Sequence, residues 1–332
     1  MVIEKMNNIN STKGVYDYSP PSPKEESEIT CNWNKGWTKP IATILCTTFQ
    51  HKNYIKNAID SFLMQETTFP FEIIVRDDAS TDGTKEIVKE YQRNYPNIIK
   101  VILEEENQFS KGVKPTMSIL PLAKGKYVAL CEGDDFWTDE HKLQKQVSFL
   151  EENDEYVIVY SDAVVIDENY NIERNSLLED RKNDYSKNEL ILSASIPTLT
   201  RCFRNVLKVI PKELDYVKNG DTFIISLLAE YGGAKYLSDI KQSVYRKHGG
   251  GIWAGINEQN KRIMLGTTFY WMSLYYKRIG MGSVAERYAH NAILQFSRPL
   301  NIKKRTAFKI FLYLFSPCLI LKLKNIFRLL SK

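Results

Sequence analysis

The chain has 332 residues, of which 43% are hydrophobic and 26% are charged. This length and this balance exclude a disordered chain and predict a globular protein of one large or two modest domains. The five cysteines are scattered, odd in number and without a CxxC pair, so we expect reduced thiols in a cytoplasmic protein rather than disulfides or a zinc site. No apolar run reaches the roughly 18 residues that span a bilayer, and the polar first ten residues predict no signal peptide.

The first 39 residues lack a clear hydrophobic period and contain the proline-rich segment 19–23. We therefore predict an N-terminal extension, 1–39, that is loose or lies over the surface. Trp33 and Trp37 indicate that the end of this extension packs on the rest of the protein.

From residue 41 onward, apolar runs that suit buried strands alternate with segments that have helical spacing. The predicted strands are 41–46, 71–75, 98–103 and 127–131, and the predicted helices lie around 54–63, 87–91 and 117–123. Continuous apolar runs are typical of strands that are buried on both faces. Their alternation with helices implies right-handed crossovers, and hence an α/β fold with a mostly parallel, doubly wound sheet.

Three polar loops follow strands of this predicted sheet, at 47–51, 77–82 and 132–135. Ligands of such sheets bind beyond the carboxyl ends of the strands. Each loop alone could be an ordinary capped turn, but all three at one edge favour a nucleotide site. The sequence lacks both a GxGxxG fingerprint and a glycine-lysine phosphate loop, so a dinucleotide or P-loop site is not expected.

The loop Glu132-Gly133-Asp134-Asp135 places three carboxylates within four residues, directly after an apolar run. Crowded carboxylates repel one another, and burying them is costly unless a cation is present. Oxygen ligands of this kind suit Mg²⁺ or Mn²⁺, which would carry a diphosphate. The alternative is an acidic surface turn that caps the next helix.

The motifs Thr47-Thr48-Phe49, Val75 to Thr84 and Glu132 to Trp137 resemble, in order and spacing, family 2 glycosyltransferases of the GT-A fold. The resemblance covers roughly 40–255. It implies a nucleotide-binding half, 40–137, and an acceptor half, 138–255.

The resemblance also implies roles for residues of the first two loops. Asp77 and Asp78 would hold the nucleoside, with Asp78 accepting a hydrogen bond from the base N3–H. Thr47 would line the base pocket, and Phe49 would lie against the ring.

The resemblance implies further that Asp134 and Asp135 match the family's DxD-type site for ribose and metal-diphosphate. Glu132 stands where a first Asp is common. Its longer side chain could contact the metal through water only.

The acceptor half is predicted to contain a helix over 143–150, a strand over 156–160 and a polar loop with a helix over 167–190. Residues 196–204 alternate in polarity and predict a small antiparallel addition to the sheet. We interpret Asp162 and Asp167 as solvated turn residues.

Asp221 lies in the first turn of a predicted apolar helix, 224–231, where the helix dipole favours a carboxylate. An aspartate at this place is often only a cap. The segment resembles the Gly-Asp of the same family, and this resemblance implies that Asp221 is the general base.

The segment Tyr245-Arg246-Lys247-His248, followed by three glycines, resembles the family's Tyr-Arg-x-His. Arg246 could neutralise phosphate charge, and His248 could bind metal or the leaving diphosphate. From the residues alone, His248 could equally be a surface residue. The glycines could form a mobile loop over the donor or an ordinary linker.

Residues 256–332 form the third predicted region, with helices over 257–297 and a basic, apolar tail. After Glu286 the chain has no acidic residue, which is typical of helices that lie on anionic membranes. The alternative is a helix packed on the catalytic domain or on a partner in a homo-oligomer.

Together these features predict an inverting, metal-dependent glycosyltransferase that uses a nucleotide sugar, most simply a UDP-sugar, at the inner face of the cell membrane. The acceptor would be a hydroxyl of a saccharide or lipid-linked saccharide in surface polysaccharide synthesis. A nucleotidyltransferase is one alternative, although the glycine- and lysine-rich triphosphate loop is absent. A non-catalytic nucleotide-sugar-binding protein is another. No nucleic-acid partner is expected, because the basic tail lacks interleaved aromatics.

Overall fold

The computed structural model describes residues 22–34, 36–177, 179–192, 194–251 and 255–297. At its centre is a seven-stranded sheet with the strand order β3-β2-β1-β4-β8-β5-β9. These strands are β1 (Ala42–Thr48), β2 (Phe71–Asp77), β3 (Ile99–Leu103), β4 (Tyr127–Leu130), β5 (Tyr156–Tyr160), β8 (Cys202–Arg204) and β9 (Gly233–Tyr236). The first four strands are mutually parallel and β8 is antiparallel to both its neighbours, so the predicted mostly parallel sheet with a small antiparallel addition is confirmed.

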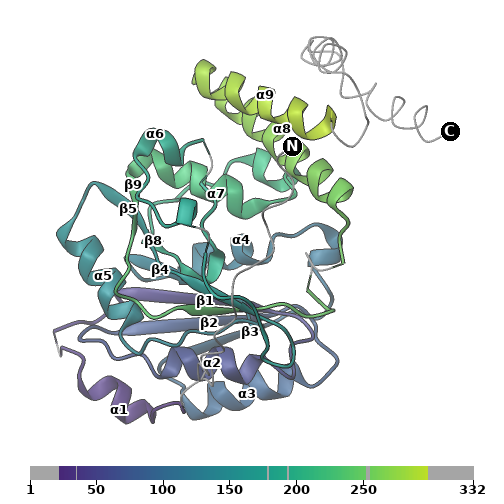
Figure 1. Ribbon diagram of the computed structural model, residues 1–332. Helices are drawn as coiled ribbons and strands as arrows, with labels where there is room; N and C mark the ends of the chain where they lie inside the picture. The colour runs from purple at the N-terminus through teal and green to yellow at the C-terminus, as the bar shows by residue number, and fades with distance from the viewer. Residues whose placement is uncertain (1–21, 35, 178, 193, 252–254, 298–332) are drawn as a thin grey trace.

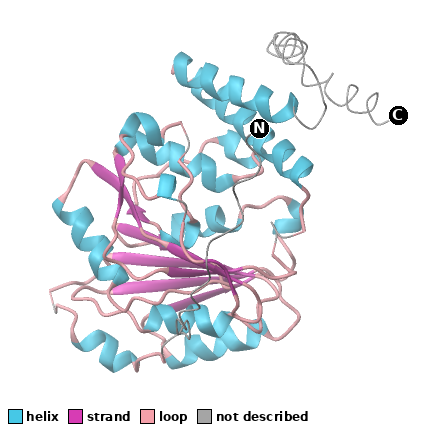
Figure 2. Cartoon of the chain, viewed as in Figure 1, coloured by secondary structure: helices cyan, strands magenta, loops and turns pink. Residues whose placement is uncertain are grey.

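Helices cover both faces of this sheet (Figures 1 and 2). The α-helices of the described residues are α1 (Glu26–Cys31), α2 (Ile55–Leu63), α3 (Thr84–Asn94), α4 (Pro115–Ile119), α5 (Lys142–Glu152), α6 (Lys187–Leu190), α7 (Gly220–Leu228), α8 (Glu258–Arg278) and α9 (Gly282–Ser297). In Figure 1, α1, α2 and α3 lie on one side of the sheet, and α4 and α7 lie on the other.

The central strand β1 explains why two layers of helices are needed. Ile44 and Cys46 belong to the hydrophobic core on the side of α2, whereas Leu45 belongs to the core on the side of α7. Successive side chains of a strand point to opposite faces, so a continuous apolar run requires cover on both. Cys46 and Cys131 are buried free thiols, as the sequence predicted.

A second, three-stranded sheet has the order β10-β6-β7 and consists of β10 (Ser243–Arg246), β6 (Ala163–Ile166) and β7 (Ile172–Arg174). Val244 of β10 is bridged to Phe136 through Val244 N–H to Phe136 O, 2.8 Å, and Phe136 N–H to Val244 O, 3.2 Å. The chain after β10 is thereby fixed next to the acidic loop 132–135.

The predicted strand over 196–204 is wrong in its first part. Residues Thr198–Thr200 form a 3₁₀ turn, and only Cys202–Arg204 pair in the sheet. Pro197 precedes the turn and accepts from Thr200 N–H at 3.2 Å. Proline has no backbone N–H to donate to a neighbouring strand, so it is not accommodated in the middle of a strand that pairs on both sides.

The predicted helix over 117–123 is also shorter than expected. It ends at Ile119 and continues as a 3₁₀ turn, Leu120–Leu122. Pro121 lies in that turn, where a regular helix would lose a hydrogen bond.

Asp162 is not a solvated turn residue. Its carboxylate accepts from Ser176 Oγ at 2.6 Å, Leu177 N–H at 2.8 Å and Gln242 Nε2 at 2.9 Å. These hydrogen bonds connect the start of β6 to the loop after β7. Asp167 accepts from the backbone of Asn169 and Asn171 and is the turn residue that was expected.

The N-terminal extension packs on the domain through Trp33, which lies edge-on to Phe71 at 5.6 Å and donates to Thr67 Oγ1 at 3.2 Å. Trp37, by contrast, is half exposed and does not share this role.

The helical C-terminal region is confirmed as the hairpin α8–α9, which turns at Gly280 with φ of 83°. Tyr276 and Tyr288 stack at 5.6 Å, and their hydroxyls contact Ser226 Oγ of α7 at 2.7 and 3.0 Å. Among the helices that the structure describes, none combines the length and apolar character needed to cross a bilayer. The predicted basic tail, 298–332, lies outside the described residues.

Candidate functional site

The three polar loops meet at the carboxyl ends of β1, β2 and β4, as parallel pairing requires. Gly133 N–H donates to Thr47 O at 2.9 Å, and Asp78 N–H donates to Thr48 O at 3.0 Å. The loop after β1 is therefore bonded on one side to the acidic loop and on the other to the Asp77-Asp78 loop.

Gly133 is required by the close contact between two of these loops. A Cβ at this position would lie 2.8 Å from Thr48 Cβ and 2.9 Å from Ile55 Cδ1. The absence of a side chain lets the carboxylates on either side of Gly133 lie against the loop after β1.

Asp78 is buried and held by a buried cation. It accepts from Arg76 Nη2 at 2.9 Å and from the backbone N–H groups of Gln108 and Phe109, each at 3.0 Å. Asp77 accepts from Ser80 N–H at 2.9 Å through one oxygen. Such fixed carboxylates can orient a polar ligand without moving.

Two aromatic rings are exposed beside this pair. Phe49 is 41% exposed and Phe109 is 44% exposed. Both are joined to backbone that contacts Asp78, because Phe49 follows Thr48 and the Phe109 N–H bonds the carboxylate. Exposed rings next to a fixed acceptor suit the stacking of a planar ligand. Phe109 was not foreseen, since its loop follows β3 and carries no motif.

The acidic loop concentrates negative charge in a region of low solvation. Desolvation, followed by the charges of Asp221 and Asp134, raises the pKa of Glu132 to about 8. Burial, followed by the charges of Asp134 and Glu132, raises the pKa of Asp135 well above its ordinary value. Asp135 accepts from Arg246 N–H at 2.8 Å. Raised carboxyl pKa values at one place indicate a site where a cation would be stabilised.

Asp134 differs from its neighbours because two histidines face it. His248 Nε2 lies 3.0 Å from Asp134 Oδ2, and His51 Nε2 lies 3.7 Å from the same oxygen. Burial raises the pKa of Asp134, but the His248 hydrogen bond and the His51 charge outweigh it, so that the pKa is lowered. Burial lowers the pKa of His51. One ligand atom from each of the three residues lies within 4.8 Å of the other two, and these residues could hold a metal ion.

Arg246 reaches the acidic loop from β10. Its Nε donates to Asp134 O at 3.2 Å, and its guanidinium carbon lies 4.9 Å from the centre of the Tyr54 ring and 4.7 Å from that of Tyr170. The side chain is 2% exposed and supplies fixed positive charge to this edge.

Asp221 lies in the first turn of α7, and its charge contributes to the raised pKa of Glu132 in the acidic loop. Its Oδ1 lies 3.3 Å from Arg201 Nη2, and its Oδ2 accepts from Thr198 Oγ1 at 3.2 Å. Arg201 is fully buried, whereas the Asp221 side chain is 50% exposed. The Asp221 carboxylate is thus oriented by a buried cation, while half of its side chain remains accessible to solvent.

Several buried polar atoms at this edge have no hydrogen-bond partner within the described chain. They are Thr48 Oγ1, His51 Nδ1, Arg76 Nη1, Asp77 Oδ2, Arg201 Nε and Nη1, and Arg246 Nη2. Buried polar groups of native proteins nearly always find partners. Their gathering at one edge therefore fits a site for a polar ligand and a cation.

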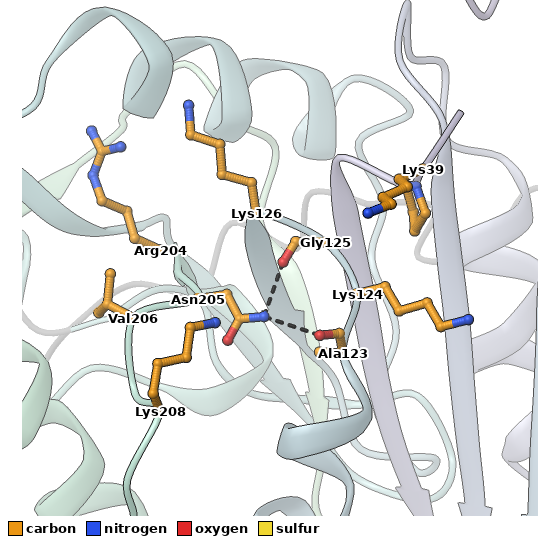
Figure 3. A pocket seen from close by; sticks show the side chains of 10 residues that line it. Lys39, Ala123, Lys124, Gly125, Lys126, Arg204, Asn205, Val206 and Lys208 are labelled. Atoms are coloured by element: carbon orange, nitrogen blue, oxygen red, sulfur yellow. Dashed lines mark hydrogen bonds between the residues drawn. The ribbon is translucent and has the colours of Figure 1, made fainter. Parts of the chain in front are cut away.

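A cavity of about 480 Å³ lies at the opposite end of β4 (Figure 3). Its wall is basic, with Lys39, Lys124, Lys126, Arg204 and Lys208 among the lining residues. The residues before β4 line it, whereas the acidic loop follows β4, so the two places lie at opposite edges of the sheet. The carboxylates and histidines described above do not line this cavity, and we therefore take the carboxyl edge as the functional site.

The family model described as "Glycosyl transferase family 2" matches residues 43–214. A protein of Mycobacterium tuberculosis that is described as uncharacterised is 33% identical over 214 residues, which are 64% of this chain and 60% of that protein. The putative teichuronic acid biosynthesis glycosyltransferase TuaG of Bacillus subtilis is 34% identical over 121 residues, which are 36% of this chain and 44% of TuaG. The match thus spans less than two thirds of the length of these relatives.

Among solved structures, Staphylococcus aureus TarS in complex with UDP-GlcNAc superposes with a TM-score of 0.56 at 18% identity, over 81% of this chain and 75% of that chain. The mannosyltransferase PcManGT from Pyrobaculum calidifontis, in complex with GDP-Man and Mn²⁺, superposes with a TM-score of 0.51 at 18% identity, over 84% of this chain and 82% of that chain. At these identities the likeness establishes a shared fold.

Proposed function

The chain belongs to glycosyl transferase family 2, and we propose that it transfers a sugar from a UDP-sugar to an acceptor hydroxyl, with inversion and with a divalent metal. Membership of this family decides against the nucleotidyltransferase and the non-catalytic alternatives. The observation that carries the proposal is the grouping of His51, Asp134 and His248, which could hold a metal ion, at the edge of the sheet where the charges of Asp221 and Asp134 both raise the pKa of Glu132. A metal-diphosphate site and a base would then face each other across the two halves.

The nucleoside is assigned to the edge beside β2. Asp78 has four lone-pair directions on its carboxylate and uses three of them within the protein. The remaining direction would accept the N3–H of uracil, with Thr47 and Asp77 nearby and Phe49 against the ring. The UDP-GlcNAc complex of TarS is consistent with a UDP-sugar donor. Because PcManGT was solved with GDP-Man, binding measurements with both nucleotides are needed to identify the nucleobase.

The diphosphate is assigned to the acidic loop and β10. Asp134 and His248 would hold Mg²⁺ or Mn²⁺ directly, and Asp135 and Glu132 would add negative charge around it. When bound, the ion would offset the charge that develops on the leaving diphosphate. Arg246 would neutralise a phosphate oxygen through its Nη2, which has no hydrogen-bond partner among the residues that the structure describes.

Asp221 would act as the general base. The acceptor oxygen forms a bond to the anomeric carbon from the face opposite the diphosphate, the bond from that carbon to the diphosphate oxygen breaks, and the hydroxyl proton passes to Asp221. A base of this type contributes about 10²–10⁴-fold. Arg201 and Thr198 fix the orientation of the carboxylate for this step.

The acceptor is proposed to be a saccharide or lipid-linked saccharide of a surface polysaccharide, at the inner face of the cell membrane. Support comes from the relative TuaG, whose name refers to teichuronic acid biosynthesis. The basic, acid-free tail would bind the anionic membrane surface.

Calorimetric titration of nucleotide sugars with and without Mn²⁺, together with a transfer assay of Asp221→Asn, tests the proposal. We expect a UDP-sugar to bind more tightly with Mn²⁺, and the variant to retain that binding while its transfer rate falls by about 10²–10⁴-fold. Loss of donor binding in Asp221→Asn would assign this residue a structural role. Full transfer activity in the presence of a chelator would remove the metal from the mechanism.

A further inference from the structure

His51 is held firmly by its backbone, yet its ring lacks a hydrogen-bond partner of normal length within the described chain. Its carbonyl accepts from Tyr54 N–H at 2.9 Å and Ile55 N–H at 2.8 Å at the start of α2. The ring is 14% exposed, its Nδ1 is buried without a partner among the described residues, and its Nε2 lies 3.7 Å from Asp134 Oδ2.

The neighbouring loop fixes both residues that flank His51. Gln50, with φ of 57°, donates its N–H to Ser80 Oγ at 2.9 Å, and Lys52 N–H donates to Asp82 Oδ2 at 2.9 Å. A left-handed residue other than glycine is costly and persists where the surroundings enforce it. The loop therefore points the His51 ring at Asp134, although no hydrogen bond of the ring to any residue that the structure describes explains this direction.

The spacing of the three facing atoms fits coordination of one ion. Ligand atoms about 2.1 Å from an ion are about 3.0 Å apart at an octahedral angle and about 3.4 Å apart at a tetrahedral one. The distances from Asp134 Oδ2 are 3.0 Å to His248 Nε2 and 3.7 Å to His51 Nε2. All three atoms lie within 4.8 Å of one another, and His51 Nε2 would have to move about 0.3–0.7 Å closer to Asp134 Oδ2 to reach these separations.

We infer that His51 is a third direct ligand of the metal, beside Asp134 and His248, an inference that rests on the proposed metal dependence. Asp135 lies outside this group of three facing residues, and its Oδ1 accepts from Arg246 N–H at 2.8 Å. Three protein ligands on one side of an ion leave the other positions for diphosphate oxygens and water.

The donor set has a consequence for the choice of metal. Mg²⁺ prefers an environment of oxygen ligands, whereas imidazole nitrogen suits transition metals. Two imidazoles and one carboxylate therefore favour Mn²⁺ over Mg²⁺ at this site.

Pulsed electron paramagnetic resonance of Mn²⁺, bound to the full chain in the presence of UDP, tests the inference without an activity measurement. We expect the wild type to show two directly bound ¹⁴N nuclei, and His51→Ala and His248→Ala to show one each. His51→Ala should also weaken Mn²⁺ binding by at least about tenfold, since even the partners that support a ligand contribute this much. His290→Ala, at an exposed position of α9, is the matched control.

The outcomes separate this inference from the proposed function. A wild-type spectrum with a single nitrogen, or unchanged Mn²⁺ affinity in His51→Ala, would overturn the role of His51 while leaving the metal site in place. A wild type that does not bind Mn²⁺ even with UDP would overturn both. Thermal melting and metal-free UDP binding of His51→Ala show whether a loss of affinity comes from unfolding, and His51→Asn, which keeps a polar side chain, repeats the test if it does.

Discussion

Individual side chains at the carboxyl edge are arranged so that charge is fixed before any ligand arrives. Asp78 is paired with buried Arg76, and Asp221 is paired with buried Arg201. In each pair the arginine is inaccessible and the carboxylate makes further hydrogen bonds, so that its orientation is set by the fold. Preorganised groups of this kind need little rearrangement when charge develops in a reaction.

Lys142 is an unusual buried cation beside the site. Its ammonium group lies 4.1 Å from the centre of the Trp137 ring and donates to Gln146 at 2.7 Å. Burial nevertheless lowers its pKa to about 8, from an ordinary 10.5. Between these two values the unfolded chain binds more protons than the folded chain, so the free energy of unfolding rises with pH in this window.

We therefore expect the stability difference between the wild type and Lys142→Met to depend on pH. Between pH 8 and 10.5 the free energy of unfolding of the wild type should rise relative to that of Lys142→Met by up to about 3 kcal/mol. The reason is that the cost of a buried charge disappears as Lys142 loses its proton. Denaturant unfolding at several pH values measures the difference, with Lys89→Met as a control for an exposed lysine on α3. A difference that stays constant across this range would contradict the expectation.

At the scale of elements, the site depends on loops that touch through backbone. The Gly133 N–H to Thr47 O bond joins the ends of β4 and β1, and the Phe136–Val244 bridge joins the acidic loop to β10. Asp134 and His248 are brought together by these two links, although they are 114 positions apart in the chain.

Gly133→Ala should separate these loops. The added methyl group would lie 2.8 Å from Thr48 Oγ1 and 2.9 Å from Ile55 Cδ1, and overpacking of this kind costs about 1–3 kcal/mol. We expect lower stability in denaturant unfolding and at least about tenfold weaker binding of UDP with Mn²⁺ by calorimetry. Gly282→Ala, where a Cβ meets no atom within 4 Å, is the control. Unchanged binding in Gly133→Ala would show that the loop contact does not position the site.

At the scale of the whole molecule, the helical hairpin α8–α9 packs on α7, the helix that carries Asp221. Ser226 of α7 bonds both tyrosine hydroxyls of the hairpin, and Tyr288 also donates to Ile191 O at 2.6 Å. The C-terminal region is therefore joined to the helix that carries Asp221 through a buried polar network. The tail beyond it remains a prediction from the sequence.

The membrane prediction is tested on the full chain by reversing three charges of the tail, Lys303, Lys304 and Arg305, to glutamate. Each basic residue near an anionic surface contributes about 1 kcal/mol. The affinity for phosphatidylglycerol vesicles, measured by co-sedimentation, should therefore fall by roughly 100-fold. A matched variant reverses the exposed residues Lys56, Lys89 and Arg93 on α2 and α3. Equal effects of the two variants would show that binding follows net charge and not the tail.

The sequence by itself determined the parallel sheet and the edge that carries the site. Continuous apolar runs and the helical segments between them are local features, and parallel strands necessarily bring their carboxyl ends to one edge. It also indicated Asp134, Asp221 and His248 as candidates, through motifs whose residue roles stay predictions. The prediction of a strand over 196–204 was wrong in its first part because of Pro197. The prediction that Asp162 is solvated was wrong because its hydrogen-bond partners are distant in sequence.

Only the tertiary structure decided which side chains face one another. His51 faces Asp134 because the 80–82 loop fixes its neighbours, and Arg201 lies behind Asp221 because a turn at Thr198–Thr200 replaces a strand. Such contacts join residues from separate elements through packing and hydrogen bonds, and no local period encodes them. The edge could be predicted, but the grouping of His51 with Asp134 and His248 and the pairing of Asp221 with Arg201 could not.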